Sequence, residues 1–337
     1  MKKTAAILLA TIVGVAGLDG IATEAAAQAS SGELKKVTLR LGFIYNAHRS
    51  PYLLGKDKGF YKAEGLEVEV LEGRGFTSTM QLVASKQDTF AVVDPPSLML
   101  GVAQGMPLKM VLQLYQKSPN AVVSWAGANI SAPKDLVGKT VATLQGDTTT
   151  TMLYALLARN NIKAADVKIF AADGGTRNQT FLGKRSEAIT GFTNDSYLSL
   201  GHTAGETLKF FRYSDYGINT MGDGVITHAD TIKASPDLVR AFVKASVRAY
   251  KHAVDNPGES IDSLEKVTKV VSREVELEKI KATKPLLASA DTDKFGVGYS
   301  SKAEWESAQA LMLEFGGLTK KAANVEEYYT NDFLPPK

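Results

Sequence analysis

Small hydroxyl and carboxamide side chains gather at three places where a predicted strand gives way to a predicted helix. They occupy the segments 73–79, 145–151 and 191–196 of this 337-residue chain. Glycine in each segment lets the backbone approach a bound molecule, and the first N–H groups of a helix have no partner inside it. Such turns bind anions or polar acceptors. Each is also explained as an ordinary capped turn, with Thr77 or Ser78 capping the first helix, but three equivalent turns together favour a binding site.

The middle segment contains four consecutive threonines, Thr148 to Thr151. Threonine is a poor residue for a helix interior but suits a helix entrance, where its hydroxyl can bond the backbone. One hydroxyl is enough to cap a helix. A ligand is one explanation for the others.

Further side chains that contact ligands follow other predicted strands. The loop 45–50 carries Tyr45, Asn46, His48 and Arg49, and is equally well explained as a solvated surface loop. Asp94 follows another strand and adds a carboxylate. Arg177, in a glycine-rich turn, either pairs with a ligand carboxylate or sulfonate or is simply solvated.

Strand and helix patterns alternate around these segments, which predicts an α/β fold with mostly parallel sheets covered on both faces. Alternating apolar residues predict a strand from Val37 to Tyr45. Ligands in open α/β sheets bind beyond the carboxyl ends of the strands, where helices begin. In the first series the other predicted elements are helices over 51–58, 77–85 and 96–104 and strands over 67–70, 90–93 and 108–115. In the second series they are a helix over 150–161 and strands over 139–144, 167–171, 187–192 and 207–213.

The two series are joined by the apolar segment 121–127, and the chain leaves the second series through 221–227. Two crossings predict that the second unit is inserted into the first. We therefore expect lobe 1 to comprise 33–121 plus 226–337, and lobe 2 to comprise 122–225. The end of the chain is predicted to be helical, with a helix opening at Ser235 and another, capped by a capping box, at Asn256 to Glu259.

The N-terminus resembles a secretory signal. Lys2 and Lys3 precede an apolar run over 5–18, and a small-residue stretch follows at 25–30. A retained membrane anchor is the alternative, but the apolar run is too short to span a bilayer comfortably. We expect residues 1–29 to be cleaved and the protein to lie in the periplasm.

Composition excludes several classes of function. The chain has no cysteine, which removes thiol nucleophiles, thiolate zinc sites, iron–sulfur clusters and lipid attachment through an N-terminal Cys. Its net charge is +3 with interspersed charges, so no nucleic-acid partner is expected. The four histidines form no His-x-x-x-His pair, and neither a Gly-x-Ser-x-Gly elbow nor a phosphate loop is present. No metal or cofactor is expected, although a catalytic triad of distant residues stays possible.

Two blocks then resemble a known family. They are Asp-Lys-Gly-Phe-Tyr-Lys-Ala-Glu-Gly-Leu-Glu-Val at 57–68 and Ser-Ala-Pro-Lys-Asp-Leu-Val-Gly-Lys at 131–139. Together with Gln81 to Ser85 and Gly105 to Leu108, they resemble solute-binding proteins of ABC importers related to thiamine-pyrimidine, aliphatic sulfonate, taurine and nitrate receptors. The resemblance covers nearly all of the chain after the signal. One departure is Lys-Arg-Ser-Glu-Ala at 184–188, where the family commonly has Gly-x-x-Asp-Ala.

The resemblance implies a type II periplasmic-binding-protein fold, in which two α/β lobes joined by two crossing strands close over a ligand. It implies a monomer that is not an enzyme and that delivers a small solute to a permease in the inner membrane. The Cys-rich eukaryotic relatives that synthesise a pyrimidine are a poor match for a chain without cysteine. The implied ligand-binding residues coincide with the polar turns, and Tyr45 of the first loop joins them as a candidate. The implied residues are Asn46, His48, Arg49, Gly75, Phe76, Thr77, Ser78, Thr79, Asp94, Asp147, Thr148, Thr149, Asn194 and Asp195.

The chemistry of the ligand stays open between two classes. Thr-rich helix entrances and Arg49 suit a sulfonate, carboxylate or nitrate. Tyr45 and Phe76 suit stacking on a planar pyrimidine, which would form hydrogen bonds with Asp94, Asn194 and Asp195. We favour the heteroaromatic or aromatic solute slightly, because carboxylates beside an anion site would repel the anion. The rivals from other classes are an exported hydrolase that uses His48 with a threonine, and the ligand-binding part of a sensor.

Overall fold

The computed structural model describes residues 33–145, 147–270 and 272–337. Residues Leu34–Lys337 form one compact unit. The predicted signal segment, 1–29, lies outside the described residues. In the part of the chain that is described, no helix is long and apolar enough to cross a membrane.

The first sheet has the order β2-β1-β3-β10-β4. Strand β10 runs antiparallel to both of its neighbours, whereas β1 is parallel to β2 and to β3. The carboxyl ends of β1 and β3 therefore meet at one edge of the sheet, where the predicted ligand loops begin. The strands are β1 (Lys35–Arg40), β2 (Leu66–Leu71), β3 (Phe90–Val93), β4 (Leu108–Gln113) and β10 (Gly224–His228).

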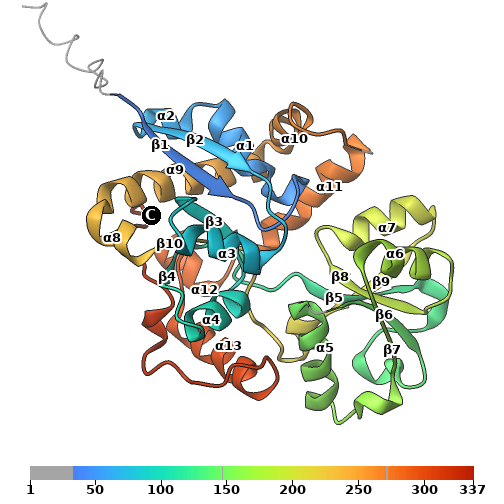
Figure 1. Ribbon diagram of the computed structural model, residues 1–337. Helices are drawn as coiled ribbons and strands as arrows, with labels where there is room; N and C mark the ends of the chain where they lie inside the picture. Colours follow the sequence, from blue (N-terminus) through green and yellow to red (C-terminus); the bar gives the residue numbers. More distant parts are fainter. Residues whose placement is uncertain (1–32, 146, 271) are drawn as a thin grey trace, which may run out of the picture. The chain divides into compact units, whose positions relative to one another are not determined.

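Helices on this sheet supply its core (Figure 1). The long helix α9 presents buried residues at helical spacing to the sheet. One of them, Phe242, stacks on Phe90 of β3 with ring centroids 3.9 Å apart and on Tyr61 at 5.4 Å. The helices of this part are α1 (Ser50–Asp57), α2 (Phe60–Ala63), α3 (Phe76–Ala84), α4 (Pro95–Ala103), α8 (Ala229–Ala234), α9 (Pro236–Asp255), α10 (Pro257–Glu265), α11 (Arg273–Thr283), α12 (Ala290–Phe295) and α13 (Lys302–Glu314).

The second sheet has the order β7-β6-β8-β5-β9, again with a single antiparallel strand, β5, between two neighbours. Phe181 of its helix α6 stacks on Trp125 of β5 with ring centroids 4.5 Å apart. Figure 1 shows this sheet with α5, α6 and α7 around it. The elements are β5 (Asn120–Trp125), β6 (Thr140–Leu144), α5 (Thr148–Arg159), β7 (Lys168–Ala172), α6 (Gly174–Leu182), β8 (Ala188–Phe192), α7 (Ser196–Ala204) and β9 (Leu208–Arg212).

The chain passes from one sheet to the other twice, between β4 and β5 and between β9 and β10. This is the predicted two-lobed α/β architecture. The predicted divisions after residues 121 and 225 fall inside β5 and β10, each of which belongs to one sheet throughout. The exact lobe limits stay a proposal.

The first predicted strand is too long, because β1 ends at Arg40 and not at Tyr45. Beyond it, the carbonyls of Gly42 and Phe43 accept hydrogen bonds from Gly75 and Gly73 at 2.9 and 3.1 Å. A Cβ atom at Gly73 would lie 1.9 Å from the Leu41 carbonyl oxygen, so only glycine allows this crossing. The loop after β1 therefore pairs with the loop after β2, and β1 does not continue to Tyr45.

The predicted capping box at the start of α10 is also wrong, since the Asn256 side chain makes no cap bond. Its Nδ2 donates to the carbonyl of His252 at 3.1 Å, in the preceding helix. Glu259 pairs with Lys58 and with His252 instead. The Glu259 carboxylate, which would accept the backbone N–H of Asn256 in a capping box, contacts these two side chains instead.

Candidate functional site

A cavity of about 1010 Å³ is lined by the turns that follow the strands of both sheets. From the first sheet come the loop after β1 and the starts of α3 and α4. From the second come the starts of α5 and α7. All of the predicted site residues except Thr79 and Asn194 line it: Tyr45, Asn46, His48, Arg49, Gly75, Phe76, Thr77, Ser78, Asp94, Asp147, Thr148, Thr149 and Asp195.

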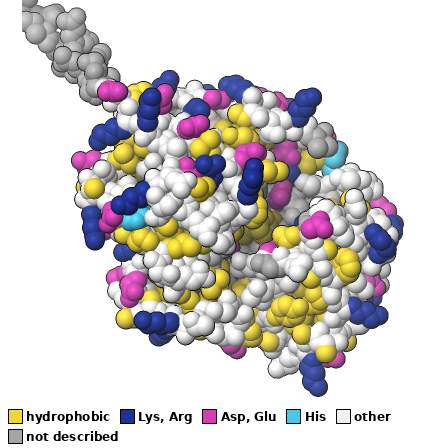
Figure 2. All heavy atoms as spheres, viewed as in Figure 1, with side chains coloured by type: hydrophobic (Ala, Val, Ile, Leu, Met, Phe, Trp, Pro, Cys, Tyr) yellow, Lys and Arg dark blue, Asp and Glu magenta, His cyan; other side chains and the backbone are white. Residues whose placement is uncertain are grey.

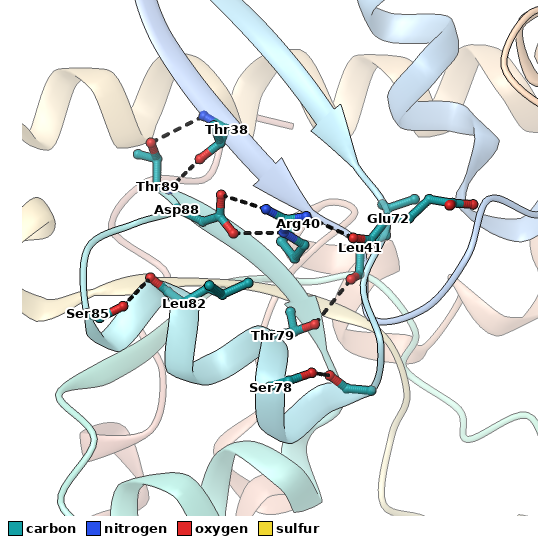
Figure 3. Close-up of polar contacts among 11 residues, drawn as sticks. Thr38, Arg40, Leu41, Glu72, Ser78, Thr79, Leu82, Ser85, Asp88 and Thr89 are labelled. Carbon is teal, nitrogen blue, oxygen red and sulfur yellow. Dashed lines mark hydrogen bonds and ion pairs between the residues drawn. The ribbon is translucent and has the colours of Figure 1, made fainter.

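Thr79 and Asn194 are buried behind the cavity wall. Figure 3 shows the Thr79 hydroxyl directed at the carbonyl of Leu41, to which it donates at 3.3 Å. Asn194 donates from Nδ2 to the hydroxyl of Thr283 at 3.2 Å. Both side chains hold lining segments in place.

Helix α3 opens into the cavity without a side-chain cap. Its N-cap is Gly75, with φ of +115°, and the prediction that Thr77 or Ser78 caps this helix is wrong. The Ser78 hydroxyl donates to the Gly75 carbonyl at 3.0 Å, as Figure 3 shows. The positive end of the helix dipole is therefore offset by no side chain at this wall.

Helices α4 and α5 are capped by carboxylates. Oδ1 of Asp94 accepts from the amide of Ser97 at 2.9 Å, and Oδ1 of Asp147 accepts from the amide of Thr150 at 2.8 Å. Burial raises the pKa of Asp94 to about 6, and the charges of Asp223 and Asp147 add to the rise. The dipole of each of these helices is matched by a negative group that also lines the cavity.

The row of threonines has mostly internal partners. Thr149 donates to Oδ1 of Asn120 at 3.3 Å, Thr150 to the Leu144 carbonyl at 2.7 Å and Thr151 to the Asp147 carbonyl at 3.2 Å. These bonds explain hydroxyls that the sequence left without a role. Three of the four hydroxyls are therefore satisfied inside the protein without a ligand.

Arg49 is buried and paired. Its Nε donates to Oδ2 of Asp223 at 2.8 Å, and Nη2 lies 2.8 Å from the same oxygen. Burial alone would lower the pKa of Arg49, but Asp223 raises it overall. Because its charge is balanced inside the protein, Arg49 is less suited to a ligand anion than its sequence position indicated. Asp223, missed by the sequence, stands 174 residues away and has no local signal.

Asp195 is likewise paired, with Nζ of Lys279 at 3.0 Å. Lys279 also contacts Glu276 at 2.8 Å. Burial by itself would raise the pKa of Asp195, but Lys279 and His48 lower it overall. Lys279 and Glu276 belong to α11 and line the cavity, and neither was predicted from the sequence.

His48 lies in the cavity wall next to these pairs. Burial lowers its pKa to about 4, and the charge of Arg49 contributes. Its Nδ1 is buried and has no hydrogen-bond partner among the described residues. At neutral pH the ring is uncharged, so one nitrogen donates and the other accepts.

Arg177 also lines the cavity, so it is more than a solvated surface group. Its Nη1 donates to the Thr190 carbonyl at 3.1 Å, and Nη2 donates to Asn178 at 3.0 Å. Burial lowers the pKa of Arg177, against the charges of Asp147 and Asp195.

Aromatic rings form another part of the wall. Phe43 and Phe76 meet edge to face with ring centroids 5.1 Å apart, and Phe43 is 41% exposed. Phe76 was predicted from the sequence to contact the ligand, whereas Phe43 was expected to belong to a strand. Exposed rings of this kind suit contact with a planar molecule.

Within the described ranges no group of three or more His, Cys, Asp or Glu side chains is arranged to hold a metal ion. On the face drawn in Figure 2, basic and acidic side chains lie next to one another.

Comparison with known proteins shows relatives along most of the chain. It is 27% identical over 321 residues to the riboflavin-binding protein RibY of Chloroflexus aurantiacus, which covers 93% of this chain and 90% of the relative. It is 24% identical over 233 residues to the formylaminopyrimidine-binding protein of Halalkalibacterium halodurans, covering 68% and 70%. It is 22% identical over 238 residues to the 4-amino-5-hydroxymethyl-2-methylpyrimidine phosphate synthase of Legionella pneumophila, covering 70% and 75%.

Among solved structures, the periplasmic aliphatic sulphonate binding protein SsuA of Escherichia coli has a TM-score of 0.70 at 13% identity, covering 91% of this chain and 95% of that protein. The likeness confirms the predicted fold class, two α/β lobes of a periplasmic binding protein. The family model described as NMT1/THI5 like matches residues 46–260, more than half of the chain. The chain therefore belongs to the NMT1/THI5-like family.

Proposed function

We propose that this protein is the substrate-binding component of an ABC importer and holds a small heteroaromatic solute in the cavity described above. The observation that carries the proposal is that one cavity is lined by helix starts from both sheets. A solute held there contacts both lobes at once, which favours a closed conformation. The names of two relatives, a riboflavin-binding and a formylaminopyrimidine-binding protein, support a heteroaromatic ligand.

The charges of the cavity are mixed and do not by themselves select between this ligand class and a sulfonate or nitrate, because Arg74, Arg177 and Lys269 also line it. Two of the basic groups that line it, Arg49 and Lys279, are paired with carboxylates at 2.8 and 3.0 Å. Asp94 and Asp147 line the same space. An anion would have to compete with these carboxylates. The rings of Phe43 and Phe76 offer a surface for a planar molecule.

The location and partners follow from this role. We propose a periplasmic protein, freed from its signal segment, that acts as a monomer and docks on a permease in the inner membrane. The periplasmic structural neighbour supports this placement.

An enzymatic role is the alternative, and one relative is named as a synthase. The hydrolase interpretation needs His48 as a general base. A pKa of about 4 makes His48 a weak base at neutral pH. Among the described residues, His48 shares no hydrogen bond with a threonine hydroxyl. We therefore favour binding without turnover.

Calorimetry tests this proposal directly. The protein is unfolded and refolded to remove any co-purified molecule, then titrated with riboflavin, formylaminopyrimidine, methanesulfonate and nitrate. We expect saturable binding of a heteroaromatic solute, and mass spectrometry should recover that solute unchanged. Absence of binding to every member of the panel contradicts the receptor function, and conversion of a bound solute supports the enzyme.

A further inference from the structure

We propose that the side of the cavity formed by α3 and α4 is a subsite for the apolar ring of a fused heteroaromatic solute, whose hydrogen-bonding ring meets the polar turns. This inference rests on the proposed receptor function and specifies the shape and polarity of its ligand. The subsite is an apolar wall made of Phe43, Ile44, Phe76, Met80, Leu100 and Met106, all of which line the cavity.

The apolar wall is continuous and belongs to elements around the first sheet. Phe76 and Met80 lie one turn apart on α3, and therefore on the same face of that helix. Helix α4 packs beside α3 (Figure 1) and contributes Leu100 and Gly101 to the lining. A Cβ atom at Gly101 would lie 3.2 Å from Sδ of Met80 and 3.3 Å from Sδ of Met106, so both thioethers lie over this glycine. The two helices and the turn after α4 therefore form one apolar surface.

This surface carries no charge of its own. Among the described lining residues, those of α3, of α4 and of the turn after α4 include no charged side chain. Arg74 and Asp94 precede the two helices, and the other charged lining residues belong to the loop after β1, the second sheet and the segment 269–279. A charged or polar part of a solute therefore finds its partners outside the apolar wall.

Two large side chains of the apolar wall are open to solvent. Phe43 is 41% exposed and Ile44 is 66% exposed, and both line the cavity. Large apolar side chains gathered at a concave surface are typical of ligand sites, because a bound molecule removes them from water. The exposure of this pair, beside the half-buried Phe76, Leu100 and Met106, indicates an apolar occupant.

An aromatic occupant suits the apolar wall better than an alkyl chain. Phe43 and Phe76 meet edge to face at 5.1 Å, and a further ring can extend such an aromatic cluster. The sulfur atoms of Met80 and Met106 make favourable contacts with aromatic rings, and their flexible chains adapt to the shape of a ligand. An alkyl chain would gain only the non-directional apolar contact.

The remaining walls decide what the rest of the solute must carry. The second sheet contributes mainly hydrogen-bonding groups, among them Gln145, Thr148 and Ser196. A molecule that contacts both this side and the apolar wall needs a polar ring joined directly to an apolar one. A fused heteroaromatic ring system has this form, and it is rigid, so little conformational entropy is lost on binding.

Two probes with the same hydrogen-bonding ring test the inference. Lumichrome is lumazine with a dimethylbenzene ring fused to it, so the two differ in the apolar ring alone. Equilibrium dialysis of the protein freed from co-purified molecules would give the affinity for each, and for formylaminopyrimidine, methanesulfonate and pentanesulfonate. The ratio of the lumichrome affinity to the lumazine affinity measures the contribution of the apolar ring.

Substitutions then locate that contribution. Phe43→Ala removes an exposed ring, and its matched control is Phe295→Ala, because Phe295 is also 41% exposed and stacks on Tyr299 at 4.4 Å but lies outside the described lining. Met106→Gln keeps the length of the side chain and makes it polar. Its control is Leu313→Gln, at a 37% exposed position outside this lining. Thermal unfolding shows whether each variant is folded, and if Met106→Gln is not, Phe43→Ala and the wild-type ratio decide.

We expect the wild type to bind lumichrome about tenfold to a hundredfold more tightly than lumazine, the gain from burying apolar surface the size of a large side chain. Phe43→Ala and Met106→Gln should each lower this ratio by about threefold to tenfold. The two control variants should keep the wild-type ratio.

Several results would overturn the inference and leave the receptor function standing. They are a wild-type ratio near one, cavity variants that keep the wild-type ratio, and control variants that lower it as much as the cavity variants do. Tighter binding of pentanesulfonate than of lumichrome would assign the apolar wall to an alkyl chain and has the same consequence. So does binding of another solute when neither lumichrome nor lumazine binds. Absence of binding to all five probes and to riboflavin removes the inference together with the receptor function.

Discussion

At the residue scale, burial decides what the charged groups of the cavity can do. Arg49 and Asp223 are both buried and lie in contact, so each charge serves the other. Asp94 lines the cavity without such a cation and its pKa rises to about 6. A charged side chain that lines the cavity therefore binds an opposite charge on a ligand only when no other protein group already balances its own charge.

Asp94 should make stability depend on pH. Its pKa is higher in the folded protein than the ordinary value of 3.8, so the folded state binds more protons between those two values. The stability that this group contributes is thus greatest below pH 4 and falls by about 3 kcal/mol as pH rises through 6. Burial raises this pKa, hydrogen bonds from Ser97 oppose the rise, and the charges of Asp223 and Asp147 add to it. Urea unfolding of the wild type and of Asp94→Asn between pH 4 and 8 should show the difference between them growing in favour of the variant, and a constant difference contradicts this.

The Arg49–Asp223 pair should be important for folding. Asp223→Asn leaves the buried guanidinium without its counter-charge, and we expect a loss of about 3–5 kcal/mol in the free energy of unfolding. The control is Asp230→Asn, whose partner Lys86 is 57% exposed, and which should lose about 1 kcal/mol or less. If denaturant titrations gave Asp223→Asn and Asp230→Asn the same loss in the free energy of unfolding, burial of the Arg49–Asp223 pair would be unimportant.

At the element scale, α11 connects the two sets of elements around the cavity. It packs against α7 of the second sheet and against the short helical turn η1 (Ala47–Arg49) of the first. Lys279 and Thr283 of α11 contact Asp195 and Asn194, which precede α7. A few polar contacts thus hold α11 to the start of α7. A movement of one lobe relative to the other would strain or break these contacts.

We expect Lys279→Met to loosen this connection, because it leaves Asp195 and Glu276 without their shared cation. Amide hydrogen exchange should become faster in residues 194–199, and ligand affinity should fall. Lys281→Met is a matched control on the same helix, since Lys281 pairs with Glu278 and is 57% exposed. Identical exchange in the two variants would contradict a linking role for Lys279.

The crossing of the loops after β1 and β2 depends on Gly73. Gly73→Ala places a Cβ atom 1.9 Å from the Leu41 carbonyl oxygen, so the loop that leads into α3 must move. We expect a loss of about 1–3 kcal/mol in stability and weaker ligand binding. Gly127→Ala meets no atom within 4 Å and should change neither quantity in thermal unfolding or calorimetry.

At the scale of the whole molecule, the described fold is contained in Leu34–Lys337. The segment before it is predicted to direct export and not to contribute to the site. We expect mass spectrometry of the protein recovered from a bacterial periplasm to show the loss of residues 1–27 or 1–29. A chain beginning at residue 30 should bind the ligand with the affinity of the exported form, and retention of the full N-terminus in the membrane fraction would contradict this.

The sequence by itself determined the succession of strands and helices and the positions of the polar turns between them. Those features follow from apolar periodicity and from glycine, which act over a few residues. The cavity-lining positions of Gly75, Asp94, Asp147 and Asp195 follow in turn, because the carboxyl ends of parallel strands meet at one edge.

Only the tertiary structure decided which of these side chains are free to meet a ligand. The hydroxyls of Thr149 and Thr150 are used inside the protein, and Arg49 and Asp195 are paired with Asp223 and Lys279, far along the chain. No local pattern encodes such partners, because their pairing depends on packing that brings distant segments together and removes them from water.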